Sequence, residues 1–267
     1  MRAALQSTCL ELRIVLSDAN AGKTSDGVAN GGARLAELIR REVCNSGSQL
    51  SVVAHSLGGI YARYALRALE QEGWFEAANV QPVNFITLAT PHLGIQETSQ
   101  VVLMAIYVGG WLVCPTGSDL ANHTKVMDEL VDDAAIAALR RFRHRVVYGN
   151  LINDNLVRPC TSLIVPKSPD STDFPERIPV QLPKVEMTGE DKLTAFSGKY
   201  RGAVSKILAR LLPLEWERYA VYMPKMSKTG DAHVQIENHA VKDKGQGGRE
   251  VMAHLGRLFA EKSKTDL

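Results

Sequence analysis

The segment that decides the fold is LSVVAHSLGGIYARYALRA, residues 50–68. It opens with a short apolar run typical of a buried strand, and its second half carries apolar side chains at helical spacing. Between them lies AHSLG at residues 54–58, a form of the strand–turn–helix motif G-x-S-x-G with alanine in the first position. The motif predicts a positive φ for Ser56. It also requires small residues two positions before and after the serine, because the chain doubles back there.

This turn would give Ser56 a chemical role. Its hydroxyl is expected to stand clear of the sheet edge, at the N-terminus of a helix whose free N–H groups favour a developing oxyanion. The N–H of Leu57 is the predicted oxyanion donor. The serine-glycine match alone also fits an ordinary glycine-rich turn, but the strand before it and the helix after it favour a nucleophilic serine.

Strands alternate with helices along the rest of the chain, which is typical of a mainly parallel sheet with helices on both faces. We therefore expect one α/β domain over residues 1–267. A mostly helical, cap-like insertion is expected near 97–143, and a cluster of prolines predicts a long loop near 159–199. The other expected elements are strands at 10–16, 51–53, 83–89, 145–148 and 219–223, and helices at 32–43, 200–212 and 248–262.

The composition is that of an ordinary globular domain, with 45% hydrophobic and 22% charged residues. A net charge of only +2 gives no electrostatic case for nucleic-acid binding. Four scattered cysteines have neither metal-ligand spacing nor the density of a disulfide scaffold, so we expect no metal site. No secretory signal is visible at the start, and a cytoplasmic, reducing setting is the expectation.

The longest apolar run is VVLMAIYVGGWLVC, residues 101–114. A helix needs about 20 residues to span a bilayer, so this run is too short. It is expected to form either a buried helix or part of a cap over the active site whose apolar surface meets lipid. The second alternative would place the protein peripherally at membranes or lipid droplets.

A serine hydroxyl is a poor nucleophile near neutral pH, so Ser56 needs a histidine base and a carboxylate that fixes the tautomer of that base. In α/β-hydrolases the three follow in the order serine, acid, histidine. Asp154 lies in a polar, turn-prone cluster just past the expected strand 145–148, where function concentrates in open α/β sheets. The alternative is that Asp154 only forms an Asx-type turn and has no catalytic role. Asp132 and Asp133 are weaker candidates because they lie in a helical pattern.

Seven histidines compete for the role of base, and the expected order leaves two of them. His233 and His239 both lie between the last expected strand and the last expected helix. His233, in the stretch DAHVQI, is preferred, and His239 is the alternative. The alternative for both His233 and His239 is an ordinary surface histidine without a catalytic role. The remaining histidines belong to the serine motif, to a turn or to the last helix, or they precede Asp154.

Five stretches are together more specific than the serine motif alone: VVAHSLGGIYARYAL at 52–66, NFITLATPHLGI at 84–95, ALRRFRHRVVYGNLINDNLV at 138–157, LEWERYAVYM at 214–223 and AHVQI at 232–236. In these stretches the chain resembles the eukaryotic family of lipase-like serine esterases, which have the α/β-hydrolase fold. The similarity covers most of the length. The resemblance assigns the nucleophile to Ser56, the acid to Asp154 and the base to His233. It implies hydrolysis of carboxylic esters, in particular those of lipids, without a cofactor.

One departure from the family pattern is expected to matter. Family members open with a strand that ends in a His-Gly loop, which supplies the second oxyanion N–H, and no His-Gly pair precedes Ser56 here. The sequence therefore reads as N-terminally truncated, without the strand that would lie between those at 10–16 and 50–53. We expect these two strands either to pair directly or to leave a gap in the sheet. Loss of one oxyanion donor lowers turnover by about 10²–10³.

The sequence thus predicts a serine hydrolase that cleaves carboxylic esters, with a lipid or another ester as its binding partner. The missing loop favours an alternative, a catalytically silent α/β-hydrolase scaffold that acts by binding. A thioesterase or an amidase would use the same three residues, since the triad serves any acyl transfer.

Overall fold

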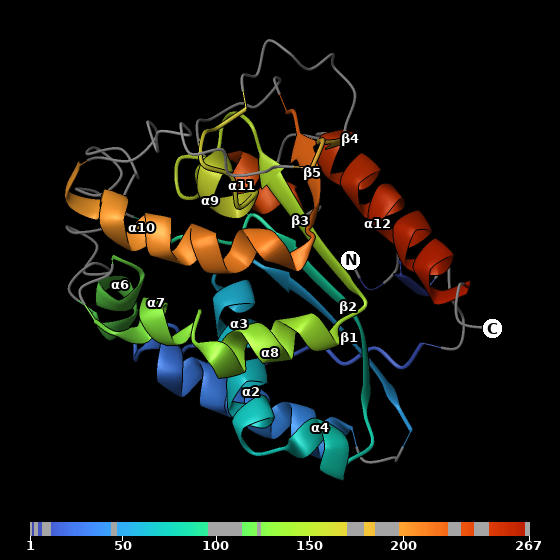
Figure 1. Cartoon of the computed structure of the whole chain (residues 1–267). Helices are drawn as coiled ribbons and strands as arrows, with labels where there is room; N and C mark the ends of the chain where they lie inside the picture. Colours follow the sequence, from blue (N-terminus) through green and yellow to red (C-terminus); the bar gives the residue numbers. More distant parts are fainter. Residues whose placement is uncertain are drawn as a thin grey trace.

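A mainly parallel sheet of five strands runs through the part of the chain that the computed structural model describes (Figure 1). The strand order is β1-β2-β3-β5-β4, and only the short β4 is antiparallel to its neighbour. The strands are β1 (Gln49–His55), β2 (Gln81–Leu88), β3 (His144–Asn150), β4 (Val180–Gln181) and β5 (Glu217–Val221). The described residues are 2, 5–6, 12–43, 47–95, 114–121, 124–169, 179–184, 198–223, 231–237 and 246–264.

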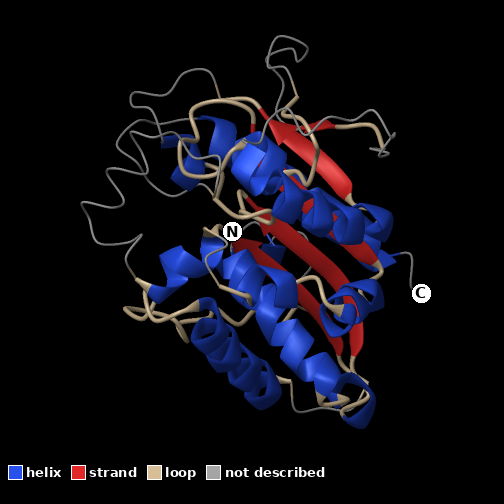
Figure 2. Cartoon of the chain, turned by 60° about the vertical axis from the view of Figure 1, so that its left-hand side comes forward, coloured by secondary structure: helices blue, strands red, loops and turns tan. Residues whose placement is uncertain are grey.

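Helices cover both faces of this sheet, which forms the middle layer (Figure 1). Figure 2 shows the helices that lie in front of one face. On one face lie α2 (Val28–Glu42), α3 (Leu57–Gln71), α8 (Asp133–Arg141) and α10 (Gly198–Leu211), and on the other lies α12 (Gln246–Lys264). The shorter helices are α4 (Trp74–Ala77), α6 (Pro115–Leu120), α7 (Val126–Glu129), α9 (Pro159–Ser162), α11 (Asp231–Gln235) and the 3₁₀ helix η2 (Leu212–Leu214).

Successive strand residues point to opposite faces, as strand geometry requires. Phe85 joins the core cluster that contains α3 and α8, whereas Ile86 joins the cluster that contains α12. In β3, Val147 likewise joins the cluster that contains α3 and α8, and Val146 joins the cluster that contains α12. Because both faces are covered, β2 and β3 are buried along most of their length. This two-sided burial agrees with the adjacent apolar pairs in these strands, Phe85 with Ile86 and Val146 with Val147, which a strand with one exposed face would not need.

Side chains far away in the sequence help to fix where helices begin. α2 begins at Val28, whose N–H donates to Asp119 Oδ2 at 2.8 Å across a separation of 91 residues. A carboxylate at this end also complements the positive pole of the helix dipole. α8 is capped locally, because Asp132 Oδ1 accepts a hydrogen bond from the N–H of Ala135.

The expected order of strands and helices is confirmed from β1 onward, with boundaries shifted by a few residues. The expected strand at 10–16 is wrong over its described part, 12–16, which pairs with no described strand. Direct pairing of this segment with β1 is therefore also wrong, and β1 forms an edge of the described sheet. Leu12 and Ile14 instead pack beside Val53 against the core under α12. Apolar contact thus holds the segment without a backbone ladder.

Parts of the expected insertions lie outside the described residues. Within 97–143 the described part is largely helical, as α6, α7 and α8. Residues 96–113 are not described, and they include nearly all of the apolar run 101–114. The expected loop at 159–199 contains the short α9 and β4, while residues 170–178 and 185–197 are not described. Among the described residues, no helix combines the length and the apolarity needed to cross a bilayer.

Two glycines allow α2 to pack closely against α3. A Cβ atom built on Gly32 would lie 2.6 Å from the Cβ of Tyr64, and one built on Gly31 would lie 2.3 Å from the ring of Tyr61. Separations this short do not occur between non-bonded carbon atoms. The two helices can therefore approach only because both positions lack a side chain.

Gly32→Ala is expected to destabilise the protein by about 1–3 kcal/mol, because overpacking outweighs the better helix propensity of alanine. Gly202→Ala in α10 is the matched control, since Gly202 is exposed and nothing lies within 4 Å of an added Cβ. The control should raise stability by up to about 1 kcal/mol. Urea unfolding measures both variants. Equal stability of the two would contradict the close packing of α2 on α3.

Candidate active site

Ser56 occupies the turn between β1 and α3 with the positive φ that its motif predicts. Its φ is 51° and its ψ is −129°, a combination that residues with a side chain rarely adopt. Two hydrogen bonds hold the turn. The N–H of Ser56 donates to Leu88 O, and the hydroxyl of Thr90 donates to Ser56 O, both at 2.9 Å. Both partners come from the end of β2, so the neighbouring strand anchors the turn.

The closest packing at this turn involves Gly59. A Cβ on Gly58 would lie 4.0 Å from the Cβ of Ala54, an ordinary contact, so a small residue at each of these positions is sufficient. A Cβ on Gly59 would lie 2.3 Å from Thr90 Oγ1. The glycine that allows Thr90 to reach the turn is therefore Gly59, which the motif did not single out.

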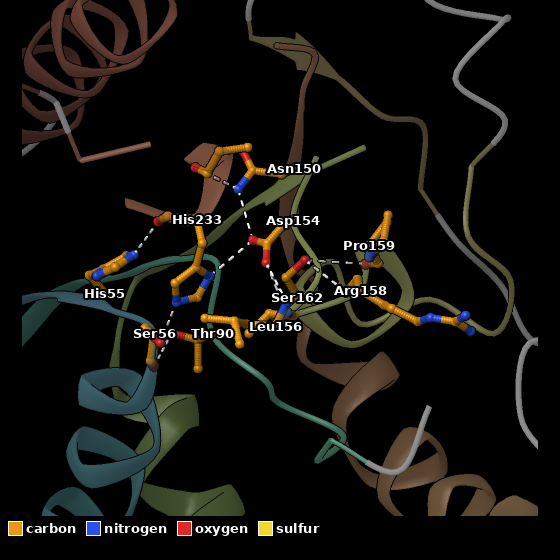
Figure 3. A network of polar contacts seen from close by, with 12 residues as sticks. His55, Ser56, Thr90, Asn150, Asp154, Leu156, Arg158, Pro159, Ser162 and His233 are labelled. Carbon is orange, nitrogen blue, oxygen red and sulfur yellow. Dashed lines mark hydrogen bonds and ion pairs between the residues drawn. The ribbon is translucent and has the colours of Figure 1, made fainter. Parts of the chain in front are cut away.

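The hydroxyl of Ser56 points to a histidine instead of capping α3 (Figure 3). Ser56 occupies the N-cap position, where a serine commonly accepts a hydrogen bond from the helix backbone. No described side chain caps α3, and Ser56 Oγ lies 2.7 Å from His233 Nε2. The N–H of Leu57, the first residue of α3, lies at the open end of this helix, where no intrahelical acceptor is available.

His233 connects this serine to a carboxylate. Its second ring nitrogen, Nδ1, lies 3.0 Å from Asp154 Oδ2, and the side chains of His233 and Asp154 are only 6% and 1% exposed. A carboxylate accepts hydrogen bonds, so the ring hydrogen belongs on Nδ1. Nε2 is then free to accept the proton of the serine hydroxyl.

Asp154 is held by the loop that follows β3. Its Oδ1 accepts hydrogen bonds from the N–H groups of Leu156 and Val157, at 3.1 and 2.9 Å. Its Oδ2 also accepts from Asn150 Nδ2 at 2.9 Å, and the same amide donates to Ala232 O at 3.1 Å. One asparagine therefore joins the carboxylate to the backbone of α11, which carries the histidine (Figure 3).

The structure thus brings together Ser56, Asp154 and His233, the three residues that the sequence singled out. Asp132 and Asp133, the weaker acid candidates, form ion pairs with arginines on α3 and α10. His239 lies outside the described residues. Within the described ranges, no group of three histidine, cysteine, aspartate or glutamate side chains is placed to hold a metal ion.

Sequence reasoning missed the buried support beneath the turn. Arg63 on α3 donates hydrogen bonds to His92 O and Leu130 O, at 3.0 and 2.6 Å. Burial lowers the pKa of Arg63 to about 9. Burial, together with the charge of Arg63, holds the pKa of His92 well below its usual range. The neutral His92 pairs through Nε2 with Thr87 Oγ1 at 2.8 Å. The stretch TPHLGI at 90–95, which follows β2 and contains His92, is the sequence signal that could have pointed to this support.

A mainly parallel sheet with helices on both faces, carrying a serine at a strand–helix turn, defines the α/β-hydrolase fold. The family model described as "Putative serine esterase (DUF676)" matches residues 4–164, which is more than half of the chain. The chain belongs to this serine esterase family, a family of ester hydrolases. The matched region includes Ser56 and Asp154 and ends before His233.

The chain is also similar to yeast proteins whose names contain the word lipase. "Putative lipase ROG1" of Saccharomyces cerevisiae is 37% identical over 146 residues, which cover 52% of this chain and 21% of that protein. "Putative lipase YDL109C" of the same yeast is 32% identical over 146 residues, which cover 52% of this chain and 22% of that protein. "Putative lipase C4A8.10" of Schizosaccharomyces pombe is 35% identical over 124 residues, which cover 41% of this chain and 15% of that protein. The chain spans about a fifth of the length of the curated relatives it matches. No solved structure matches it.

Asn150→Asp is expected to destabilise the protein in a pH-dependent way. Its new carboxylate would face Asp154 Oδ2, where the amide now donates at 2.9 Å, and two carboxylates this close do not both ionise. One of them then has a folded-state pKa above its unfolded value. Stability is therefore lost as the pH rises through that pKa and is recovered as the pH falls below it.

Asn150→Leu is the matched control, because it removes the same donors without adding a charge. Urea unfolding at about pH 4.5 and about pH 7 should give a stability gap between the two variants that is larger at the higher pH. A gap that does not change with pH would contradict the placement of Asn150 against the carboxylate of Asp154.

Proposed function

We propose that the protein is a serine esterase in which Ser56 is the nucleophile, His233 the general base and Asp154 the residue that orients the base. The observation that carries the proposal is the continuous contact from Ser56 Oγ to His233 Nε2, at 2.7 Å, and from His233 Nδ1 to Asp154 Oδ2, at 3.0 Å. Both distances are those of hydrogen bonds. Membership in a serine esterase family supports the same reaction class.

In the first half of the reaction, Ser56 Oγ attacks the ester carbonyl carbon while His233 Nε2 takes the hydroxyl proton. The carboxylate of Asp154 stabilises the imidazolium that forms. The N–H of Leu57 donates to the oxyanion of the tetrahedral intermediate, assisted by the positive end of α3. The intermediate then collapses, the alcohol leaves with the proton from His233, and the acyl group remains on Ser56.

The second half of the reaction repeats these steps with water. His233 Nε2 takes a proton from a water molecule, whose oxygen attacks the acyl carbonyl carbon. The new oxyanion again accepts a hydrogen bond from Leu57. Collapse breaks the bond to Ser56 Oγ, and the proton returns from His233 to the serine. The products are a carboxylic acid and the free enzyme.

Lipid acyl esters are the substrate class that we propose. The relatives whose names contain the word lipase support this choice. The apolar run 101–114 also supports it, because its sequence is of the kind that meets lipid or a partner when it is exposed. Contact with a membrane or lipid-droplet surface, made from the cytoplasm, is part of the same proposal.

A fluorophosphonate probe should label the 267-residue chain at Ser56, and Ser56→Ala should abolish the labelling. Ser51→Ala is the matched control, because Ser51 lies on β1 and its hydroxyl accepts a hydrogen bond from Asn84. That variant should be labelled like the unmodified chain. Labelling that persists in Ser56→Ala would exclude Ser56 as the nucleophile. A complete lack of labelling in the unmodified chain would favour the catalytically silent scaffold.

Asp154→Asn should keep the fold and lower ester turnover by about 10⁴, because an amide cannot hold the required tautomer or balance the charge of the imidazolium. Asp132→Asn is the matched control, since Asp132 caps α8 and takes no part in the contacts that join Ser56, His233 and Asp154. Turnover of p-nitrophenyl esters and circular dichroism measure activity and fold. Loss of turnover in His239→Ala, with turnover retained in His233→Ala, would move the role of base to His239.

The substrate class is tested by comparing soluble short-chain esters with emulsified long-chain esters. Turnover should rise at the lipid–water interface, and Leu103→Asp and Ile106→Asp should reduce that gain by placing charge in the apolar run. Rates on soluble esters should stay the same in both variants. Equal rates on both kinds of ester, unaffected by the charged substitutions, would contradict a lipid substrate.

A further inference from the structure

We propose that His55, the residue before Ser56, is a positioning residue that holds the base His233 at bonding distance from the nucleophile. The inference rests on the proposed function and deepens it. It starts from one contact, in which His55 Nε2 lies 2.7 Å from the backbone oxygen of His233 (Figure 3). His55 thus reaches the backbone of His233, which lies 178 residues further along the chain.

The chemistry of this contact fixes where the hydrogen lies. A backbone carbonyl only accepts hydrogen bonds, so Nε2 of His55 must be the donor. Burial is the main cause that lowers the pKa of His55, and the charge of the His233 ring lowers it further, while Glu237, the hydrogen bond to His233 O and Asp154 act in the opposite direction. The net lowering favours a neutral ring with a single hydrogen. That hydrogen occupies Nε2, where it meets His233 O.

The contact closes a ring of atoms around the reacting pair. From Ser56 the ring runs through one peptide bond to His55, then through the His55 Nε2–H bond to His233 O. It continues along the side chain of His233 and returns to Ser56 Oγ through the second 2.7 Å contact. The two imidazole rings lie 4.9 Å apart between centroids. His233 therefore cannot move away from the serine hydroxyl without breaking or stretching one of these bonds.

α11 depends on such tertiary contacts for its position. It has only five residues, and a helix this short has no stability of its own. Among the described residues, two side chains reach its backbone carbonyls, Asn150 at Ala232 O and His55 at His233 O. They come from the carboxyl ends of β3 and β1, so the helix is tied to two strands of the sheet. Loss of the His55 bond would remove the attachment of α11 to β1, the strand that leads into Ser56.

Glu237 makes a second, weaker contribution. Its Oε1 lies 3.6 Å from His55 Nδ1, beyond ordinary hydrogen-bond distance. Its side chain is 28% exposed, so solvent screens the interaction. The bond from Nε2 to His233 O therefore carries most of the positioning.

Two substitutions of His55 separate the proposed bond from general packing. A glutamine side chain can place an amide N–H near the present position of Nε2, whereas an asparagine amide falls near Nδ1, too short to reach His233 O. His55→Asn should lower kcat for ester hydrolysis and the rate of fluorophosphonate labelling by about 10–100-fold, because a small misplacement of the base is costly. KM should stay constant, since His55 touches the base and not the substrate. His55→Gln should restore most of the lost rate.

His144→Asn is the matched control, because His144 lies at the start of β3, at the opposite end of the sheet from Ser56, and should leave kcat unchanged. If the unmodified chain is labelled at Ser56 and His55→Asn keeps its kcat, this inference is overturned while the proposed function stands. If the unmodified chain is not labelled at all, both are overturned.

The ring tautomer of His55 gives a measurement that does not depend on activity or on the folding of a variant. ¹⁵N spectra of the histidine-labelled, unmodified protein should show the hydrogen of His55 on Nε2. A hydrogen on Nδ1 alone would exclude the bond to His233 O and overturn the inference.

Discussion

The left-handed backbone at Ser56 is the constraint on which the rest of the site depends. A residue with a side chain in such a conformation carries strain of order 1–3 kcal/mol, so its surroundings must hold it. Leu88 O and the Thr90 hydroxyl bind the two backbone groups of Ser56, and Gly59 leaves the space that Thr90 needs. The consequence is geometric. A relaxed N-cap serine would bond to its own helix, whereas this hydroxyl turns away from α3 and meets His233.

Parallel pairing brings the other parts of the site within reach of this hydroxyl. β1, β2, β3 and β5 run in the same direction, so their carboxyl ends share one edge of the sheet. Ser56 follows β1, Thr90 follows β2 and Asp154 follows β3, while His233 comes after β5. Because β3 lies between β2 and β5, the loop after β3 is next to the segment that carries the histidine. The strand order therefore places Asp154 beside His233 and Thr90 beside Ser56.

This relation between chain order and strand ends explains how much could be predicted from the sequence. Ser56 has a local motif. The parallel sheet and the expected order of serine, acid and histidine selected Asp154 and reduced the histidines to His233 and His239, although Ser56 and His233 are 177 residues apart. Features without a local signature escaped prediction. The start of α2 depends on Asp119, which lies 91 residues further along the chain. The segment 12–16 is rich in apolar and β-branched residues typical of a strand, but a ladder requires a partner, and no described strand provides one. Leu12 and Ile14 pack against the core instead, whereas Val15 and Leu16 are exposed.

Arg63 is the most instructive of these missed features, because in the sequence it is an ordinary helix residue. A buried charge is unfavourable unless hydrogen bonds compensate it, and those of Arg63 go to backbone oxygens of His92 and Leu130. The first of these belongs to the loop that also carries Thr90. α3 therefore begins at the strained serine and, two turns later, carries the side chain that secures the loop supporting that serine. A protonated His92 would place a second positive charge beside Arg63, and its low pKa prevents this at neutral pH. The helix and the loop thus hold one another in place, so the strain at Ser56 is supported by the core and not by the site alone.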